Sequence, residues 1–438
     1  MNTEKLTPNQ KRYGKAMEWM KFISKVGAFQ IIIQGLTLLT GLIVIRKLSQ
    51  NSESEATLYF IANNMLSTMV ILADGGITNG VMSLGAQAAS DRTRLGKIVV
   101  TGLDLRKKFA IGSTIIALPI TIYLLMKNGN SFGITMLMFA SILPMFYFSL
   151  AGNLLEIVAR IKQDLVPLQT IRTKNNVFRL ILTLSFIFIF PLAYIAIVVT
   201  AIPQYFANRE LKKNAEQYAD FKQKPDPKIR KDILKVVAKI LPGAAYYSIS
   251  GQISIYLLTI FSDNSNQAIA EIGGLEKLSL ALAVITSLFA TIVTPRFAAI
   301  VNNKQLLLNR FVQIFVLLIG VSGGIIFMFW IFDDLLLKIL GDKYIGLNYE
   351  LLLCIVSACL GMIAGNVYGL FTNRGWNIFP IISIALSIAT YIIGGFIFEI
   401  GTLVGILHFN IFVNVLNLVI NAGFMLYKIN TLKTLKIK

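Results

Sequence analysis

The sequence predicts an all-α integral membrane protein with about twelve transmembrane helices. We expect two six-helix halves around a central cavity, related by a parallel pseudo-two-fold repeat. The composition supports this fold, because 55% of the 438 residues are hydrophobic and only 14% are charged, whereas soluble domains carry about 25% charged residues. Apolar segments near 20 residues also recur along the chain, which is the length of a helix that crosses a bilayer. Lysines and arginines cluster between alternate segments, as the positive-inside rule requires.

We expect the spans in the following order, with the turn at Pro191 as the tightest connection. The segments are 26–46, 56–84, 107–126, 132–156, 168–190, 191–207, 235–261, 270–300, 307–332, 350–372, 377–398 and 400–427.

Basic residues set the expected orientation. The residues before the first span, the loops after spans two and four, the central polar stretch and the tail are all rich in lysine and arginine. The alternate loops at 51–55 (NSESE) and 262–267 (SDNSNQ) contain none. We therefore expect both termini in the cytoplasm. This distribution accounts for the net charge of +19 without nucleic acid as a partner.

The polar stretch NRELKKNAEQYADFKQKPDPKIRKD, residues 208–232, divides the chain into six spans and six spans. Both halves start inside and run in the same direction, which is the arrangement of a parallel repeat. Transporters of this design place their substrate site between the halves. The predicted parts are a basic N-terminus 1–25, an N-terminal half 26–207, a linker 208–233, a C-terminal half 234–427 and a basic tail 428–438.

The sequence gives no indication of a bound metal or other cofactor. Cys354 and Cys359 are five residues apart on a predicted helix, so they point in different directions and favour neither a disulfide nor a zinc site. His408 is the single histidine and cannot form a histidine cluster. We favour a packing role for it over a proton relay.

Four stretches carry a family resemblance: ADGGITNGV in span two, ILPGAAYYSISGQISIYLL in span seven, EKLSLALAVITSLFATIVTPRFAAI in span eight and GDKYIGLNYELLLCIVSACL before span ten. With the span count, the chain resembles the polysaccharide flippase (O-antigen, Wzx-type) branch of the multidrug, oligosaccharidyl-lipid and polysaccharide exporter superfamily. The second glycine of ADGG departs from the usual pattern of the family.

The resemblance implies a carrier of the bacterial inner membrane that moves a polyprenyl-diphosphate-linked oligosaccharide from the inner to the outer leaflet. Two halves would form a V and rock between inward-open and outward-open states. The implied partners are this lipid-linked oligosaccharide and membrane lipids, with glycan polymerases or glycosyltransferases as candidates, and we expect a monomer.

An anionic diphosphate substrate requires fixed positive charge in the cavity. Arg179 in span five and Lys277 in span eight are the first candidates, because intramembrane charge is costly and marks functional sites. Arg172 lies seven residues before Arg179 and shares its helix face. The alternative for Arg179 and Lys277 is snorkelling to the membrane surface. For Arg296 and Arg374, at helix ends, we favour anchoring.

Uncharged polar side chains would bind the glycan hydroxyls. Gln30 and Gln34 lie one turn apart in span one, Asn64 lies in span two, and Tyr247 and Gln252 lie in span seven. Hydrogen bonding between helices is the competing role for each of them.

Asp74, Gly75 and Gly76 interrupt span two toward its cytoplasmic end. We expect a hinge near the inner gate, because the two glycines weaken the helix. Asp74 would hold this bend by pairing with Arg92 or Arg94. A coupling carboxylate for H⁺ or Na⁺ is the second interpretation of Asp74, and a simple helix end at the interface is the third.

The main competing function is a cation-coupled multidrug exporter of the same superfamily, which needs a buried carboxylate. The basic residues in the spans argue against it, because they repel cationic drugs. A membrane-embedded glycan enzyme is disfavoured, because the predicted outer loops are short and the one histidine lies inside a span.

Overall fold

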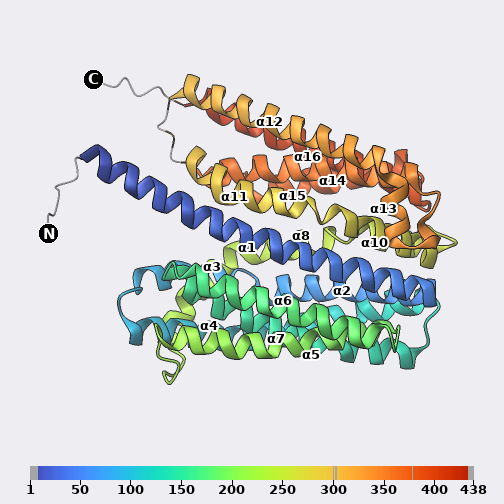
Figure 1. Cartoon of the computed structure of the whole chain (residues 1–438), viewed down its shortest axis with the longest axis horizontal. Coiled ribbons are helices and arrows are strands. Elements are labelled where there is room, and N and C mark those ends of the chain that lie inside the picture. Colours follow the sequence, from blue (N-terminus) through green and yellow to red (C-terminus); the bar gives the residue numbers. More distant parts are fainter. Residues whose placement is uncertain (1–7, 299, 301–302, 377, 433–438) are drawn as a thin grey trace.

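The computed structural model describes residues 8–298, 300, 303–376 and 378–432, with side chains from residue 27 onward except at 291, 292 and 295. All regular structure in this part of the chain is helical (Figure 1). The first lobe, called the N lobe, contains α1 (Pro8–Asn51), α2 (Glu53–Asp74), α3 (Ile77–Gln87), α4 (Arg92–Lys127), α5 (Phe132–Ile161), α6 (Leu165–Ile187) and α7 (Ala193–Glu216).

The second lobe, the C lobe, follows in the chain. It contains α8 (Pro227–Ser250), α9 (Ile253–Phe261), α10 (Ser265–Ser279), α11 (Leu282–Ala298), α12 (Lys304–Ile331), α13 (Asp333–Leu340), the 3₁₀ turn η1 (Asp342–Tyr344), α14 (Asn348–Thr372), α15 (Pro380–Ile397) and α16 (Leu403–Asn430). Helix α1 runs between the two lobes (Figure 1).

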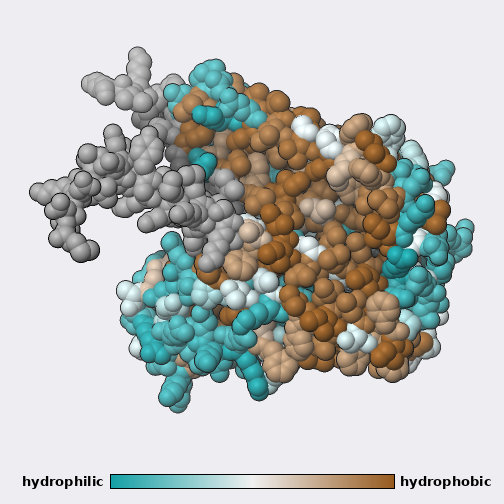
Figure 2. Space-filling view, in the orientation of Figure 1, coloured by the Kyte–Doolittle hydropathy of each residue, from teal (hydrophilic) through white to brown (hydrophobic). Residues whose placement is uncertain are grey.

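The predicted all-helical membrane fold is confirmed. Eight helices among the described residues are long and apolar enough to cross a membrane, and the bent pair α10–α11 makes a ninth. Helices α6, α7 and the pair α8–α9 coincide with the other three predicted spans. Figure 2 shows an apolar belt between two hydrophilic ends of the molecule. We call the end where α1 begins and α16 ends the basic end, and the other the opposite end.

Three predicted spans are not continuous helices. The span 56–84 breaks at Gly75 and Gly76, the span 235–261 breaks at Gly251 and Gln252, and the span 270–300 bends by 47° after Ser279. The first break has a direct cause in the backbone, since Gly75 and Gly76 have φ angles of +46° and +96°, which are strained for other residues.

Several helix ends also differ from the predicted boundaries. Helix α1 already begins at Pro8, so the predicted change at residue 26 is not a structural break. The linker is shorter than the predicted 208–233, because α7 continues to Glu216 and α8 starts at Pro227. Asp226 caps α8 by accepting the backbone N–H groups of Lys228 and Ile229.

The buried apolar residues form three clusters, and their distribution defines the relation of the lobes. One cluster draws on both lobes: it joins α1, α2, α4, α5 and α7 with α9, α10, α13, α14 and α16. A second cluster lies in the basic half of the N lobe and also takes Ile233 and Val237 from α8. A third belongs to α11, α12, α14 and α16 alone. The lobes therefore share a core toward the opposite end and have separate cores toward the basic end.

Candidate functional site between the lobes

The break in α2 is held by a buried ion pair. Arg106 of α4 is only 2% exposed, and its guanidinium donates to the carboxylate of Asp74, to Thr78 and to the Leu150 carbonyl. Asp74 also accepts the backbone N–H of Thr78 in the first turn of α3. The predicted pairing of Asp74 with Arg92 or Arg94 is wrong; Arg92 instead donates to the Glu216 carbonyl.

The two glycines of this break also face the other lobe. A Cβ atom on Gly75 would lie 2.9 Å from Leu241 Cδ1, and one on Gly76 would lie 2.8 Å from Ile240 Cβ. Both neighbours belong to α8. Gly75 and Gly76 therefore serve two needs at once, a left-handed backbone and a close approach of α8.

One face of α1 points toward the C lobe. Gly27 and Gly41 lie on it, because their Cβ positions approach Leu288 of α11 and Lys277 of α10. Gln34 is seven residues from each and shares that face, and Gln30 is one turn before it. Both glutamines are half-buried, and neither side chain bonds to another described residue. Their predicted place between the halves fits this geometry.

Lys277 projects from α10 toward the N lobe. Its Nζ lies 5.9 Å from the centre of the Tyr59 ring of α2, and its stem contacts the Gly41 position of α1. It is half-buried, about 18 Å along α10 from Ser265 by helix rise. Among the side chains that the structure describes, no carboxylate forms an ion pair with it. Lys277 is thus a fixed cation at the contact of the two lobes.

The two arginines predicted to share a stripe on α6 have different surroundings. Arg172 binds both oxygens of the buried Glu156, at 2.8 Å from Nε to Oε1. Glu156 also pairs with Arg160 at 3.1 Å, so this carboxylate holds two arginines inside the N lobe. Arg179 is half-buried, and its Nε has no hydrogen-bond partner within the described part of the chain. Asn176, on the same face, accepts from Thr37 of α1.

The remaining predicted glycan ligands differ in their hydrogen-bond partners. Asn64 donates to the Phe60 carbonyl of its own helix, which leaves its amide oxygen available as an acceptor. Tyr247 is exposed and bonds to Ser383 of α15. Gln252 lies at the α8–α9 break, one turn after Ser248, whose carbonyl accepts from Thr68 of α2. Tyr247 and Gln252 thus both lie within about one helical turn of a bonded contact between the lobes.

The residues to which we assigned no substrate role lie in the C lobe. Arg374 donates to the carbonyls of Phe297 and Ile300 and so caps the end of α11. His408 bonds to Tyr349 at 3.2 Å and stacks on Phe398. Cys354 and Cys359 are both buried and free, as the spacing predicts. Arg296 is exposed at the basic end of α11.

Comparison with known proteins places this arrangement in a fold family. An inward-facing multidrug resistance MATE family transporter of the MOP superfamily covers 94% of the chain at 15% identity and a TM-score of 0.69, with 99% of its own chain aligned. The chain has the MATE fold. An outward-facing MATE transporter aligns with a TM-score of 0.60 at 14% identity, over 94% of this chain and 96% of its own.

A MOP superfamily transporter from Pyrococcus furiosus aligns at 15% identity, over 94% of this chain and 96% of its own, with a TM-score of 0.59. It is described as having a binding pocket of reversed polarity that suggests a different function. No protein-family model and no curated protein sequence matches the chain. At these identities the comparisons establish the fold.

Within the MATE fold, the sequence did not reveal the contact that joins the lobes at the opposite end. A Cβ atom on Gly273 of α10 would lie 2.6 Å from the Phe60 ring of α2, so Phe60 fits only against a glycine. Next to it, the Tyr344 ring covers Gly274, and its hydroxyl bonds to Ser49 at 3.0 Å and to the Ala270 carbonyl at 3.2 Å. Thr57 donates to the Asn266 carbonyl at 2.6 Å.

The sequence also did not reveal a polar cavity inside the C lobe. This cavity of about 410 Å³ lies between α8–α9, α10, α14, α15 and α16. Glu276 enters it from α10, on the side of that helix away from Lys277. Opposite stand Asn410, which accepts from Ser254 at 2.8 Å, and Asn414, which donates to Ser357 at 3.0 Å. The signal available in the sequence was the spacing of Asn410, Asn414 and Asn417 along one face of α16.

Proposed function

We propose that the protein is a multi-pass membrane transporter that works by alternating access between its two lobes, with the basic end in the cytoplasm. The observation that carries this proposal is the asymmetry of the lobe contacts: a shared core toward the opposite end and separate cores toward the basic end. Such a state opens toward the cytoplasm. The positive-inside rule supports the orientation, and the higher TM-score with the inward-facing MATE structure than with the outward-facing one supports the inward-open state.

For the substrate we propose an amphipathic anion, and specifically a polyprenyl-diphosphate-linked oligosaccharide moved from the inner to the outer leaflet of a bacterial inner membrane. Lys277 supports an anion, because it stands at the lobe contact without an ion-pair partner among the described side chains. Arg179 would add a second charge, while Gln30, Gln34 and Gln252 offer amides to glycan hydroxyls. Arg172 takes no direct part in this proposal, because Glu156 holds it.

The second candidate is a cation-coupled multidrug exporter, and the comparisons favour it over the flippase. Both the inward-facing and the outward-facing structures that align with this chain belong to multidrug resistance MATE transporters. Glu276 gives this candidate the intramembrane carboxylate that it requires. Coupling by H⁺ or Na⁺ is a proposal under either function. We assign it to Glu276 rather than Asp74, because Arg106 already engages Asp74.

In this proposal the break at Gly75 and Gly76 is the hinge of the inner gate, with Asp74 and Arg106 holding the bend. The contact of both glycines with α8 supports this role, because a movement of α8 would act directly on the break. Asn64 and Tyr247 remain candidate glycan ligands. We further propose a monomer that meets glycan polymerases or glycosyltransferases at the membrane.

The test measures export of lipid-linked oligosaccharide in cells that produce Lys277→Ala or Arg179→Ala in place of the natural protein. We expect glycan export to fall at least tenfold while the amount of folded protein stays unchanged, with partial rescue by Arg179→Lys. Lys338→Ala, at an exposed lysine of α13, is the matched control and should export normally. If deletion of the gene raises drug sensitivity without stranding lipid-linked oligosaccharide on the cytoplasmic leaflet, the flippase proposal fails and the multidrug exporter stands.

A further inference from the structure

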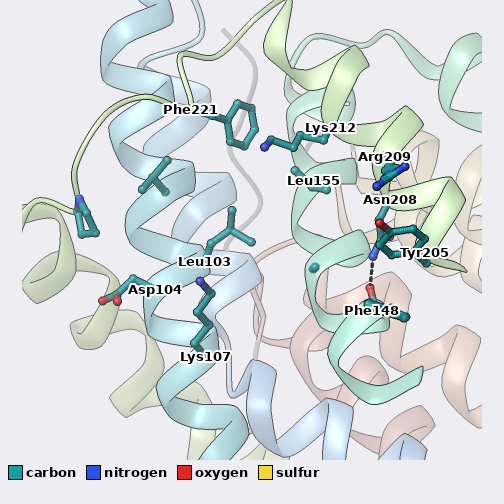
Figure 3. A pocket seen from close by; sticks show the side chains of 13 residues that line it. Leu103, Asp104, Lys107, Phe148, Leu155, Tyr205, Asn208, Arg209, Lys212 and Phe221 are labelled. Carbon is teal, nitrogen blue, oxygen red and sulfur yellow. Dashed lines mark hydrogen bonds between the residues drawn. The ribbon is translucent and has the colours of Figure 1, made fainter. Parts of the chain in front are cut away.

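A pocket opens on the flank of the N lobe near the basic end. It has a volume of about 550 Å³ and lies between α4 and the pair α5–α7, below the linker that follows α7 (Figure 3). Its floor is apolar and its rim is basic. The floor is formed by Leu103, Phe148, Ala151, Leu155 and Phe221, and the rim by Lys107, Arg209 and Lys212.

The basic rim lacks neutralising partners. Lys107 and Arg209 form no ion pair with any described side chain, and Arg209 lies 4.6 Å from the centre of the Tyr205 ring. Lys212 has only a long contact with Glu216, at 3.8 Å between two half-exposed side chains. The one carboxylate in the lining, Asp104, is engaged by Arg230 at 2.6 Å and by Lys108 at 3.3 Å. In Figure 3, Lys107 and Lys212 extend into the space between the helices.

The floor of the pocket continues into the apolar surface of the lobe. Ile111 and Ile115 follow Lys107 by one and two turns of α4 and are 57% and 66% exposed. Ile202 lies seven residues before Arg209 on α7 and is also exposed. Residues at these spacings share a helix face. An acyl chain could therefore follow this face from the pocket into the bilayer, while a phosphate stays at the rim.

We infer that this pocket binds an anionic glycerophospholipid of the leaflet at the basic end. The rim recognises the phosphate by charge, and the floor and the adjacent isoleucines hold the first part of the acyl chain. Basic pockets between helices on the cytoplasmic side bind lipid head groups in this manner. The site is separate from the lobe contact and does not depend on which substrate the protein carries.

The experiment titrates the purified full-length protein in neutral detergent with dioctanoyl phosphatidylglycerol and follows the thermal unfolding midpoint. We expect a saturable rise with phosphatidylglycerol that weakens at high salt, and no rise with dioctanoyl phosphatidylcholine or inorganic phosphate. K107A/K212A should weaken the apparent affinity roughly tenfold or more, since each lysine near anionic lipid contributes roughly fivefold. K107R/K212R should retain binding.

The matched control removes two exposed lysines that lie outside the pocket and form no ion pair with a described side chain, Lys213 of α7 and Lys231 of α8. K213A/K231A loses the same charge as K107A/K212A and should bind phosphatidylglycerol as the natural protein does. Equal stabilisation by phosphatidylcholine would reduce the site to an apolar groove and overturn the proposal. Equal stabilisation by inorganic phosphate would make it a soluble-anion site, and an equal loss in K213A/K231A would mean that net charge alone attracts the lipid. Each of these results contradicts a lipid site.

Discussion

The two lobes meet differently at the two ends of the molecule. At the opposite end, Phe60 and Tyr344 close over Gly273 and Gly274, and this contact is continuous with a core drawn from both lobes. Toward the basic end, α8 reaches across through Ile233 and Ile240 against small residues of the N lobe, and α1 meets α11 at Gly27 and Leu288. The C-lobe helices α11, α12, α14 and α16 keep a core of their own there.

If the protein transports by the proposed alternating access, this difference identifies the contacts that must change. Closing the basic end would bring together surfaces that are now separate, whereas opening the opposite end would remove the Phe60 ring from Gly273 and break the bond between Tyr344 and Ser49. Large buried aromatic contacts are costly to separate, so we expect opening of the opposite end to require more free energy than closing of the basic end. A ligand shifts this balance only through a difference in affinity between the states.

The largest expected effect comes from the ion pair that holds the α2 break. Asp74→Asn leaves the buried charge of Arg106 without its counter-ion and should lower the free energy of unfolding by about 3 kcal/mol. The matched change Asp104→Asn removes a carboxylate from a more exposed pair with Arg230 and should cost less than about 1 kcal/mol. Titration of the purified proteins with SDS measures both. Equal losses would mean that the break does not depend on this pair.

At the opposite end, Gly273→Ala places a methyl group against the Phe60 ring. Overpacking of this kind costs about 1–3 kcal/mol, and here it should be relieved by separating the lobes. Reagent labelling of a cysteine at Thr57 should therefore increase from the opposite end. Gly323→Ala in α12, where a Cβ meets nothing within 4 Å, is the control and should leave labelling unchanged. Unchanged labelling in Gly273→Ala would show that this contact does not keep the end closed.

At the basic end, a glycine-to-alanine change at Gly80, where α3 meets α8, should destabilise the protein less than Gly273→Ala does. A Cβ on Gly80 would lie 3.1 Å from Ile233 Cγ2 and 3.3 Å from the backbone Cα of Ile233, which is less crowded than the 2.6 Å approach to the Phe60 ring at Gly273. We expect Gly80→Ala to change the unfolding free energy by less than about 1 kcal/mol, because the gain from replacing a helical glycine offsets the crowding. A loss as large as that of Gly273→Ala, in the same SDS titration, would remove the distinction between the two ends.

The smallest effect concerns the start of α8. The backbone N–H groups of Ile229 and Lys228 hold the pKa of Asp226 below its usual value. A lowered folded-state pKa stabilises the cap above the ordinary carboxyl pKa, near 4, and this stabilisation is lost as the pH falls through the lowered value. The protection of the first-turn amides of α8 against hydrogen exchange, relative to their intrinsic rate at the same pH, should therefore fall below about pH 4. Asp226→Asn keeps a capping oxygen and should show no such step.

The sequence predicted the spans well, because crossing a bilayer requires long apolar helices and alternate basic loops. It predicted the break at Gly75 and Gly76, because paired glycines weaken a helix. The bend after Ser279 had no such signal, and neither did the partner of Asp74. Arg106 lies 32 residues away on another helix, and periodicity along one helix does not show which neighbour it faces. For the same reason, Glu276 and Lys277 could not be assigned to different sides of α10.

One measurement tests the central claim that the lobes are joined at the opposite end and separate at the basic end. Glu53 and Lys343 pair across the opposite end at 3.3 Å, so E53C/K343C should accept a short bifunctional thiol reagent, while the native cysteines are buried. Spin labels on Arg94 and Lys304 then report the distance between the basic ends of the lobes. We predict that the reagent cross-links the two cysteines rapidly. In the cross-linked protein the distance between the spin labels should then show only a long population, with the basic ends apart, and no short population, with the basic ends together. Failure to cross-link, or a cross-linked protein in which the shorter population persists, would contradict the account.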